Sequence, residues 1–247
     1  MENQTLISGQ QKAAKIAGLA YFLTTAIIIA VNFGINARLI VPNNATETAK
    51  NILTNESLFR LSIIAHLLYC VGIIVLLTSL YVILKPVNKT LALLATFLRF
   101  VYALVWIFVV LNFFTALRFI GSADYLRVFE TDRLQALAKV YLSGYDAYYV
   151  GLLFWSLAST ICSWLWYKSN YIPGVLAVFG IISSAWCVAC TIAFIIFPAF
   201  ENTVNLWWFD SAMTVFELVL CFWLLFKGLR PSGKMQKPIQ TDMQTKR

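Results

Sequence analysis

An arginine and a glutamate are the charged residues that lie deepest inside apolar stretches of this sequence. Arg99 follows Lys89 by ten residues, and Glu217 follows Trp207 by ten, so each would lie about 15 Å along an apolar helix. A charge inside a bilayer is costly and usually faces protein or water, often beside an opposite charge. We therefore expect Arg99 and Glu217 to pair, either as a lock between two helices or as a substrate or proton site.

The single histidine and one aspartate are further candidates. His66 lies in an apolar run with Ser62 and Tyr69 on the same helical face, and Asp146 has Ser143 beside it. One histidine cannot build a histidine-rich zinc site, so His66 is either a buried, hydrogen-bonded residue or a proton-sensing or ligand-binding group. An outward-facing polar pocket is also conceivable, and its candidate members are Asn32, Asn36, Arg60, His66, Asn112, Asp146 and Tyr149.

Motifs of the common catalytic and metal sites are missing from the sequence. It contains no HExxH, no GxSxG and no phosphate-binding loop. All five cysteines lie within apolar runs, where they are typical of small buried hydrophobic residues. Cys187 and Cys190 form a CxxC, but it has no second pair. We predict no catalytic residue, no metal, no cofactor and no nucleic-acid partner.

The composition indicates that lipid surrounds the elements that position these residues. About 60% of the 247 residues are apolar and only 12% are charged, whereas soluble domains carry roughly 25% charged residues. A helix needs ~20 apolar residues to cross a ~30 Å hydrocarbon layer, and several such runs are present. We predict an all-α, polytopic membrane protein that has the lipid bilayer as its partner.

Six segments are long enough to be transmembrane helices that form one bundle. The first also resembles a signal peptide, but no small-x-small cleavage site follows it, so we expect it to be retained. Short turns at 85–89 and 168–173 join the second span to the third and the fourth to the fifth. The predicted spans cover 16–31, 58–84, 90–117, 141–167, 172–197 and 206–226.

The first and third loops are expected to carry short interfacial helices. In the loop over 36–57, a helix from 46 to 59 is predicted, with Thr46 as its cap. In the loop over 118–139, mixed charges and the pair Leu134 and Leu137 indicate a second such helix. Either Asn88 or Thr90 is expected to cap the third span.

Basic residues predict the orientation. Eleven of the nineteen lysines and arginines fall on the side of the two termini and seven on the other, with Arg99 in between. Because cytoplasmic loops are enriched in lysine and arginine, we expect a multi-pass protein of the cytoplasmic membrane with both termini in the cytoplasm. The domains are then a cytoplasmic segment (1–13), a six-helix membrane domain (14–229) and a basic, disordered tail (230–247).

Two further patterns predict how the helices meet lipid and one another. Gly180 and Ser184 form a small-xxx-small pattern, which favours close helix packing over catalysis. Tryptophans near span ends are typical of interface anchors, and those assigned this role are Trp155, Trp164, Trp166, Trp207 and Trp208.

Several short motifs resemble those of one known family. The most specific are the turn Pro86-Val87-Asn88 and the following Phe97-Leu98-Arg99; Tyr171-Ile172-Pro173 and Glu217-Leu218 add to them. The chain is thereby identified, over 14–229, as similar to the Domain of Unknown Function 4386 family of bacterial multispanning membrane proteins. The resemblance implies a membrane location and no established activity.

These observations favour a non-enzymatic integral membrane protein that binds a small molecule or lipid, or that stabilises a partner. One alternative is a small transporter or channel in which Arg99, Glu217 and Asp146 border a water-filled cavity. The other is a membrane-embedded enzyme acting on lipid or quinone, in which His66 and Asp146 come within hydrogen-bonding reach.

Overall fold

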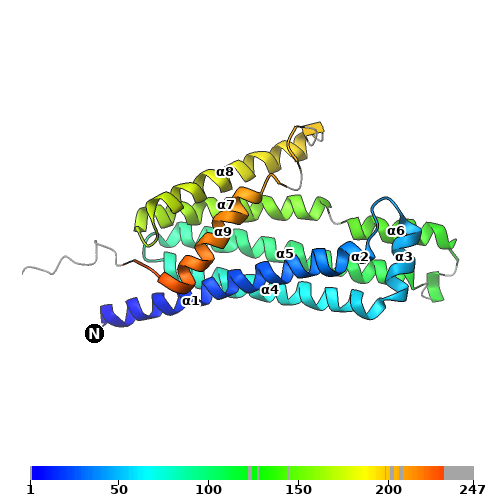
Figure 1. Ribbon diagram of the computed structural model, residues 1–247, viewed down its shortest axis with the longest axis horizontal. Helices are drawn as coiled ribbons and strands as arrows, with labels where there is room; N and C mark the ends of the chain where they lie inside the picture. Colours follow the sequence, from blue (N-terminus) through cyan, green and yellow to red (C-terminus); the bar gives the residue numbers. More distant parts are fainter. Residues whose placement is uncertain are drawn as a thin grey trace, which may run out of the picture.

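All regular elements that the structure describes are helices (Figure 1). The structure, a computed structural model, describes residues 2–121, 124–126, 128–143, 145–197, 199–200, 203–205 and 208–230, with the side chains of 2–7 and 145–147 outside the description. Helix is the expected form for such apolar runs, because in lipid each backbone N–H and C=O must be bonded within its own segment.

Five helical segments in the described part of the chain are long and apolar enough to cross a membrane. The long helices are α1 (Glu2–Ile29), α4 (Glu56–Leu84), α5 (Lys89–Ile120), α7 (Tyr145–Ser169) and α8 (Gly174–Ile196). A π-helical stretch (Ala30–Asn36) and the short α2 (Ala37–Leu39) extend α1, and α6 (Thr131–Ser143) precedes α7. The candidate spans are Ser8–Leu39, Glu56–Leu84, Lys89–Ile120, Thr131–Ser169 and Gly174–Ile196.

The sixth predicted span is shorter in the structure than in the sequence-based prediction. It consists of α9 (Ser211–Phe222), of 12 residues, and a π-helical stretch (Trp223–Lys227), of 5 residues. Seventeen helical residues reach about 25 Å, less than the ~30 Å of a hydrocarbon core. Length and composition therefore give five candidate spans in the described residues instead of the six predicted.

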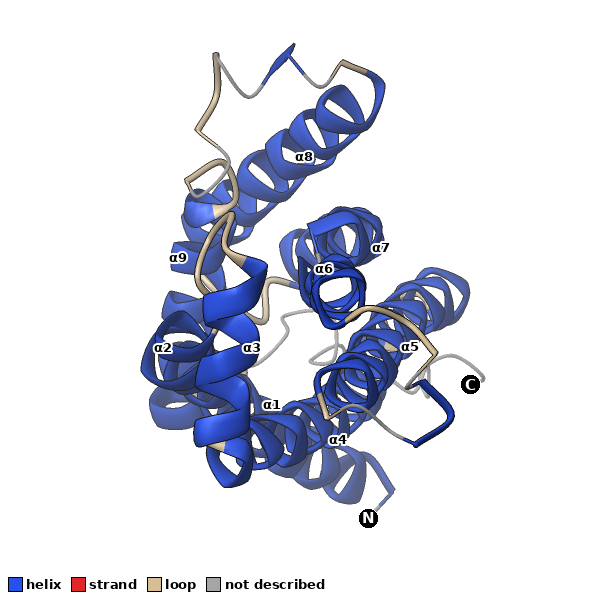
Figure 2. Ribbon diagram, turned by 90° about the vertical axis from the view of Figure 1, so that its right-hand side faces the viewer, coloured by secondary structure: helices blue, strands red, loops and turns tan. Residues whose placement is uncertain are grey.

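Six helices pack as a closed ring. Along it, α1 contacts α4, α4 contacts α5, α5 contacts α7, α7 contacts α8, α8 contacts α9, and α9 returns to α1. Figure 2 shows this arrangement along the long axis of the molecule. One hydrophobic core draws residues from every helix of the ring, among them Ala17, Leu76, Ala95, Leu165, Cys187 and Leu220.

Glycines allow the closest approaches in the ring. A Cβ atom on Gly18 of α1 would lie 2.8 Å from Cγ of Leu225, and one on Gly180 of α8 would lie 2.5 Å from the ring of Phe216. Ser184, one turn after Gly180, accepts a hydrogen bond of 3.0 Å from the Thr160 hydroxyl of α7. The small-xxx-small pattern of α8 therefore lies where α7 and α9 pack against it.

The turn between α4 and α5 has the chemistry expected of it. Pro86 follows the end of α4 because proline lacks an N–H and disfavours a helical predecessor. Oδ1 of Asn88 then accepts a 3.0 Å hydrogen bond from the N–H of Leu91. Of the two candidate caps, Asn88 is thus the one that caps α5.

A second, smaller core lies at the end of the molecule where α2, α3 (Ala45–Thr54) and α6 gather (Figure 1). The prediction that Thr46 caps α3 is wrong. Asn44 is the cap, because its Oδ1 accepts a hydrogen bond from the N–H of Glu47 at 2.9 Å while its Nδ2 donates to the Glu47 carboxylate at 3.0 Å. The predicted extension of this helix to 59 is also wrong, since Asn55 separates α3 from α4.

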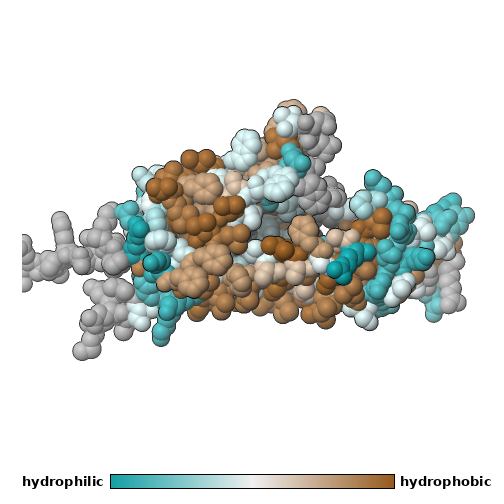
Figure 3. Space-filling model, viewed as in Figure 1, coloured by the Kyte–Doolittle hydropathy of each residue, from teal (hydrophilic) through white to brown (hydrophobic). Residues whose placement is uncertain are grey.

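The distribution of apolar residues on the surface is the one expected for a protein surrounded by lipid. In Figure 3 apolar residues cover the middle of the visible face and hydrophilic residues gather at its two ends. Large apolar side chains are exposed on α1, α4 and α5, among them Phe22, Leu68, Val71, Phe97 and Phe108. An apolar belt between two polar ends is what a multi-pass membrane protein requires.

Candidate functional site

Arg99 lies at the centre of the ring and is 1% exposed. Its Nη2 donates hydrogen bonds of 3.0 Å to the Tyr21 hydroxyl of α1 and to the Ser159 hydroxyl of α7. Its guanidinium carbon also lies 4.0 Å from the centroid of the Trp155 ring, a cation–π contact. One arginine of α5 thus contacts both α7, its neighbour in the ring, and α1, which follows α4 in the other direction.

Glu217 brings α9 to the same point. Its Oε1 lies 3.7 Å from Nη2 of Arg99 and accepts a 2.9 Å hydrogen bond from the Ser159 hydroxyl. The two charges therefore interact at slightly more than hydrogen-bonding distance, with Ser159 bonded to both. Charged and polar side chains of α1, α5, α7 and α9 meet in one cluster, which we call the charged centre: Tyr21, Arg99, Trp155, Ser159 and Glu217.

The charged centre is tightly packed around Arg99, while the Glu217 side chain keeps 14% of its surface exposed. Nε and Nη1 of Arg99 have no hydrogen-bond partner among the described residues. The space beside them is lined mainly by apolar side chains of α4 and α5, together with Cys162 of α7, and it does not admit a water-sized sphere. Such a centre can hold helices together by charge and hydrogen bonding, and the space beside the guanidinium has no room for a solute.

The prediction that Trp155 is an interface anchor is wrong, because this side chain is buried against Arg99. Trp166 is likewise buried, whereas Trp164 and Trp208 are exposed, and Trp207 lies outside the described residues. The spacing of Trp155, Ser159, Cys162 and Trp166 could have revealed the difference. A stripe at intervals of three or four residues is one helix face, and this face points into the ring.

Tyr21 was also missed by the sequence analysis, although a signal for it exists. Ala14, Ala17, Tyr21 and Thr24 recur at helical spacing and are all buried. Small residues on one face allow close helix approach, and a tyrosine among them brings a hydroxyl into the core, where it requires a partner. In the structure that partner is Arg99.

The structure links three of the seven candidate residues of the outer polar pocket. His66 is buried, and its Nδ1 donates a 2.7 Å hydrogen bond to the carbonyl of Ser62. The Ser62 hydroxyl donates to Oδ1 of Asn36 at 2.8 Å, and Nδ2 of Asn36 donates to Oδ1 of Asn32 at 3.4 Å. The imidazole also stacks on Trp106, with ring centroids 5.5 Å apart.

The other four candidates have different surroundings. Arg60 is exposed and pairs with Glu56 at 2.7 Å. Tyr149 packs among aromatic rings, with its centroid 5.7 Å from that of Phe194. Asn112 is half-buried on α5, and the side chain of Asp146 lies outside the described residues.

A further contact ties the start of α9 to α7. The Tyr148 hydroxyl donates a 2.6 Å hydrogen bond to Oδ2 of Asp210, the residue directly before α9. The sequence analysis did not single out either residue. Asp210 and Glu217 therefore connect α9 to α7 at two points, one directly before α9 and one in the middle of it.

The part of the chain that the structure describes contains no candidate metal site. Those residues include no group of three or more histidine, cysteine, aspartate or glutamate side chains that could hold a metal ion. All five cysteines are free and buried, which confirms their prediction as small buried residues.

Comparison with known proteins identifies the family. The family model for a domain of unknown function, DUF4386, matches residues 16–228. The chain belongs to the DUF4386 family. The match confirms the resemblance found in the sequence, and it includes both Arg99 and Glu217. No curated protein and no solved structure matches the chain.

Proposed function

We propose that this member of the DUF4386 family is a non-enzymatic protein of the cytoplasmic membrane that binds or stabilises another membrane component. In this proposal the charged centre is a structural lock. The observation that supports it is the packing of Arg99 and Glu217 against Tyr21, Trp155 and Ser159, without space for water beside the guanidinium. A transport path would need these charges to border a water-filled cavity.

Native Cys162 provides a test of the tight packing around Arg99, because its side chain lines the same space as Arg99. A small, charged methanethiosulfonate reagent is expected to leave Cys162 unlabelled in the folded protein and to label it after unfolding. Mass spectrometry measures the labelling. An Asn43→Cys variant is the positive control, since Asn43 is exposed in a loop. Labelling of Cys162 in the folded protein would instead support a water-filled path.

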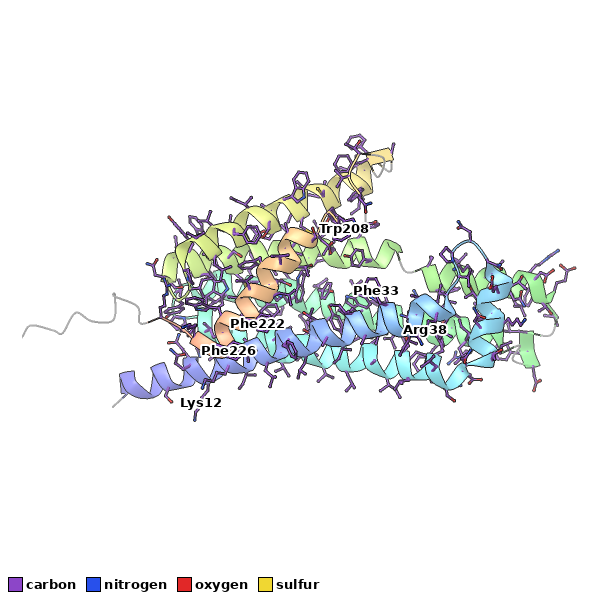
Figure 4. All side chains as sticks on the ribbon, viewed as in Figure 1. Lys12, Phe33, Arg38, Trp208, Phe222 and Phe226 are labelled. Atoms are coloured by element: carbon purple, nitrogen blue, oxygen red, sulfur yellow. The ribbon has the colours of Figure 1, made fainter. Side chains whose placement is uncertain are left out.

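The proposal includes six spans, with α9 and the π-helical stretch after it as the sixth. This segment completes the ring between α8 and α1, and its Phe222 and Phe226 side chains are exposed beside α1 (Figure 4). In the same view, Lys12 and Arg38 lie at opposite ends of the first span. An even number of spans puts both termini on one side.

A fusion experiment tests this topology. A phosphatase that is active only outside the cytoplasm is expected to be inactive when fused after Arg247 and active when inserted after Asn43. The reason is the excess of lysine and arginine on the side of the termini. Activity of both fusions would instead require an odd number of spans.

A further inference from the structure

A groove with two arginines lies where the start of α4 meets the end of α5. It has a volume of about 420 Å³ and is lined by Glu56, Arg60, Phe114, Leu117, Arg118 and Gly121. The walls combine two guanidinium groups and one carboxylate with the apolar side chains of Phe114 and Leu117. This groove is separate from the charged centre, which lies deeper in the ring.

The charges of the groove are unbalanced. Arg60 pairs with Glu56 at 2.7 Å, whereas no acidic side chain in the described part of the chain pairs with Arg118. Arg118 also lies in the last turn of α5, where a positive charge interacts favourably with the helix dipole. The groove therefore has a net positive charge, and no acidic side chain among the described residues neutralises the Arg118 guanidinium.

An apolar stripe extends from each arginine along the outside of its helix. On α4 the stripe continues from Arg60 through Ile64 and Leu68, and on α5 it continues from Arg118 back through Phe114 and Leu111, at intervals of three or four residues; these four apolar side chains are exposed. Since α4 and α5 pack against each other, the ends of the two stripes at Arg60 and at Phe114 and Arg118 meet in the groove. A ligand in the groove would thus have an anionic head and apolar tails.

We propose that this groove binds the phosphate headgroup of an anionic phospholipid whose acyl chains lie along the seam between α4 and α5. Guanidinium groups suit phosphate because they present several N–H donors in a planar fork. Long arginine side chains reach the membrane interface while their stems cover apolar surface. This inference names the ligand class for the binding role proposed above.

Binding to the full-length protein in non-ionic detergent, measured by native mass spectrometry, tests the proposal. The probes are dioleoylphosphatidylglycerol and dioleoylphosphatidylcholine. The anionic lipid is expected to bind at least about fivefold more tightly, and Arg118→Gln is expected to weaken it about fivefold, the contribution of one basic residue near an anionic surface. Glu56→Gln, which frees Arg60, should tighten binding.

Matched variants distinguish lipid binding in the groove from non-specific electrostatic attraction of an anionic lipid to the protein. Arg38→Gln combined with Lys50→Gln removes two exposed positive charges from the same end of the protein but outside the groove, and it should leave phosphatidylglycerol affinity unchanged. Arg60→Lys combined with Arg118→Lys keeps both charges but loses the planar donor fork, so it should weaken phosphatidylglycerol binding while keeping the preference for phosphatidylglycerol over phosphatidylcholine.

Three results would overturn the proposal. They are equal affinity for the two lipids, equal loss in the Arg38/Lys50 control, and displacement of the lipid by millimolar inorganic phosphate, which would indicate a site for a soluble anion. A failure here would leave Cys162 protected, so the lipid site and the packing of the charged centre are tested independently.

Discussion

Replacing Arg99 with leucine is expected to destabilise the folded protein by about 3–5 kcal/mol, because the change leaves the Glu217 carboxylate without its cation inside the ring. Tyr21 and Ser159 lose a hydrogen-bond donor at the same time, and the Trp155 ring loses its cation. The measurement is the free energy of unfolding in mixed micelles, together with the amount of folded protein in the membrane.

The matched control for this change is Arg60→Leu. Arg60 also pairs with a glutamate, but its side chain is 54% exposed, and exposed ion pairs contribute about 0–1 kcal/mol. Equal losses from Arg60→Leu and Arg99→Leu would show that burial of the charge has no special effect. Such a result would contradict the structural role of the charged centre.

The substitution Gly180→Leu is expected to destabilise the protein by about 3 kcal/mol. Even a Cβ atom there would lie 2.5 Å from the Phe216 ring and 2.6 Å from Oγ of Ser163, and overpacking a close contact typically costs about 1–3 kcal/mol, occasionally more. The larger side chain should push α8 away from α7 and α9. Thermal melting in detergent and the yield of monodisperse protein measure the effect.

Gly174→Leu is the control for Gly180→Leu, because no atom lies within 4 Å of a Cβ at the start of α8. It removes the same residue type from the same helix and should leave the melting temperature nearly unchanged. If the two variants lose stability equally, the close contact of α8 with α9 is not what Gly180 provides.

The sequence predicted the helices best where it contains both an apolar run and a clear end signal. The predicted boundaries 58–84 and 90–117 lie within three residues of α4 and α5, because Pro86 and Asn88 interrupt the apolar pattern. The sixth span was overestimated because hydropathy also counted Trp208 and Phe209, which lie outside α9. Hydropathy measures preference for lipid, and it does not specify where a helix begins.

The charged centre could be predicted only in part. Arg99 and Glu217 stand out because charges are rare in apolar runs. Tyr21, Trp155 and Ser159 do not, because the same residue types occur on many helix faces. Which face meets Arg99 depends on the order of helices around the ring, and this order comes from tertiary packing. The outer polar residues show the same limit, since Arg60 and His66 have separate surroundings.

The free energy of unfolding of the charge-exchanged protein tests the charged centre most directly. Arg99→Glu and Glu217→Arg should each destabilise the protein on their own, since each puts two like charges in the centre of the ring. Combined in one chain, they should recover at least half of the lost stability, because opposite charges again face each other. A combined loss equal to the sum of the two single losses would contradict direct pairing and with it the role of the charged centre as a lock.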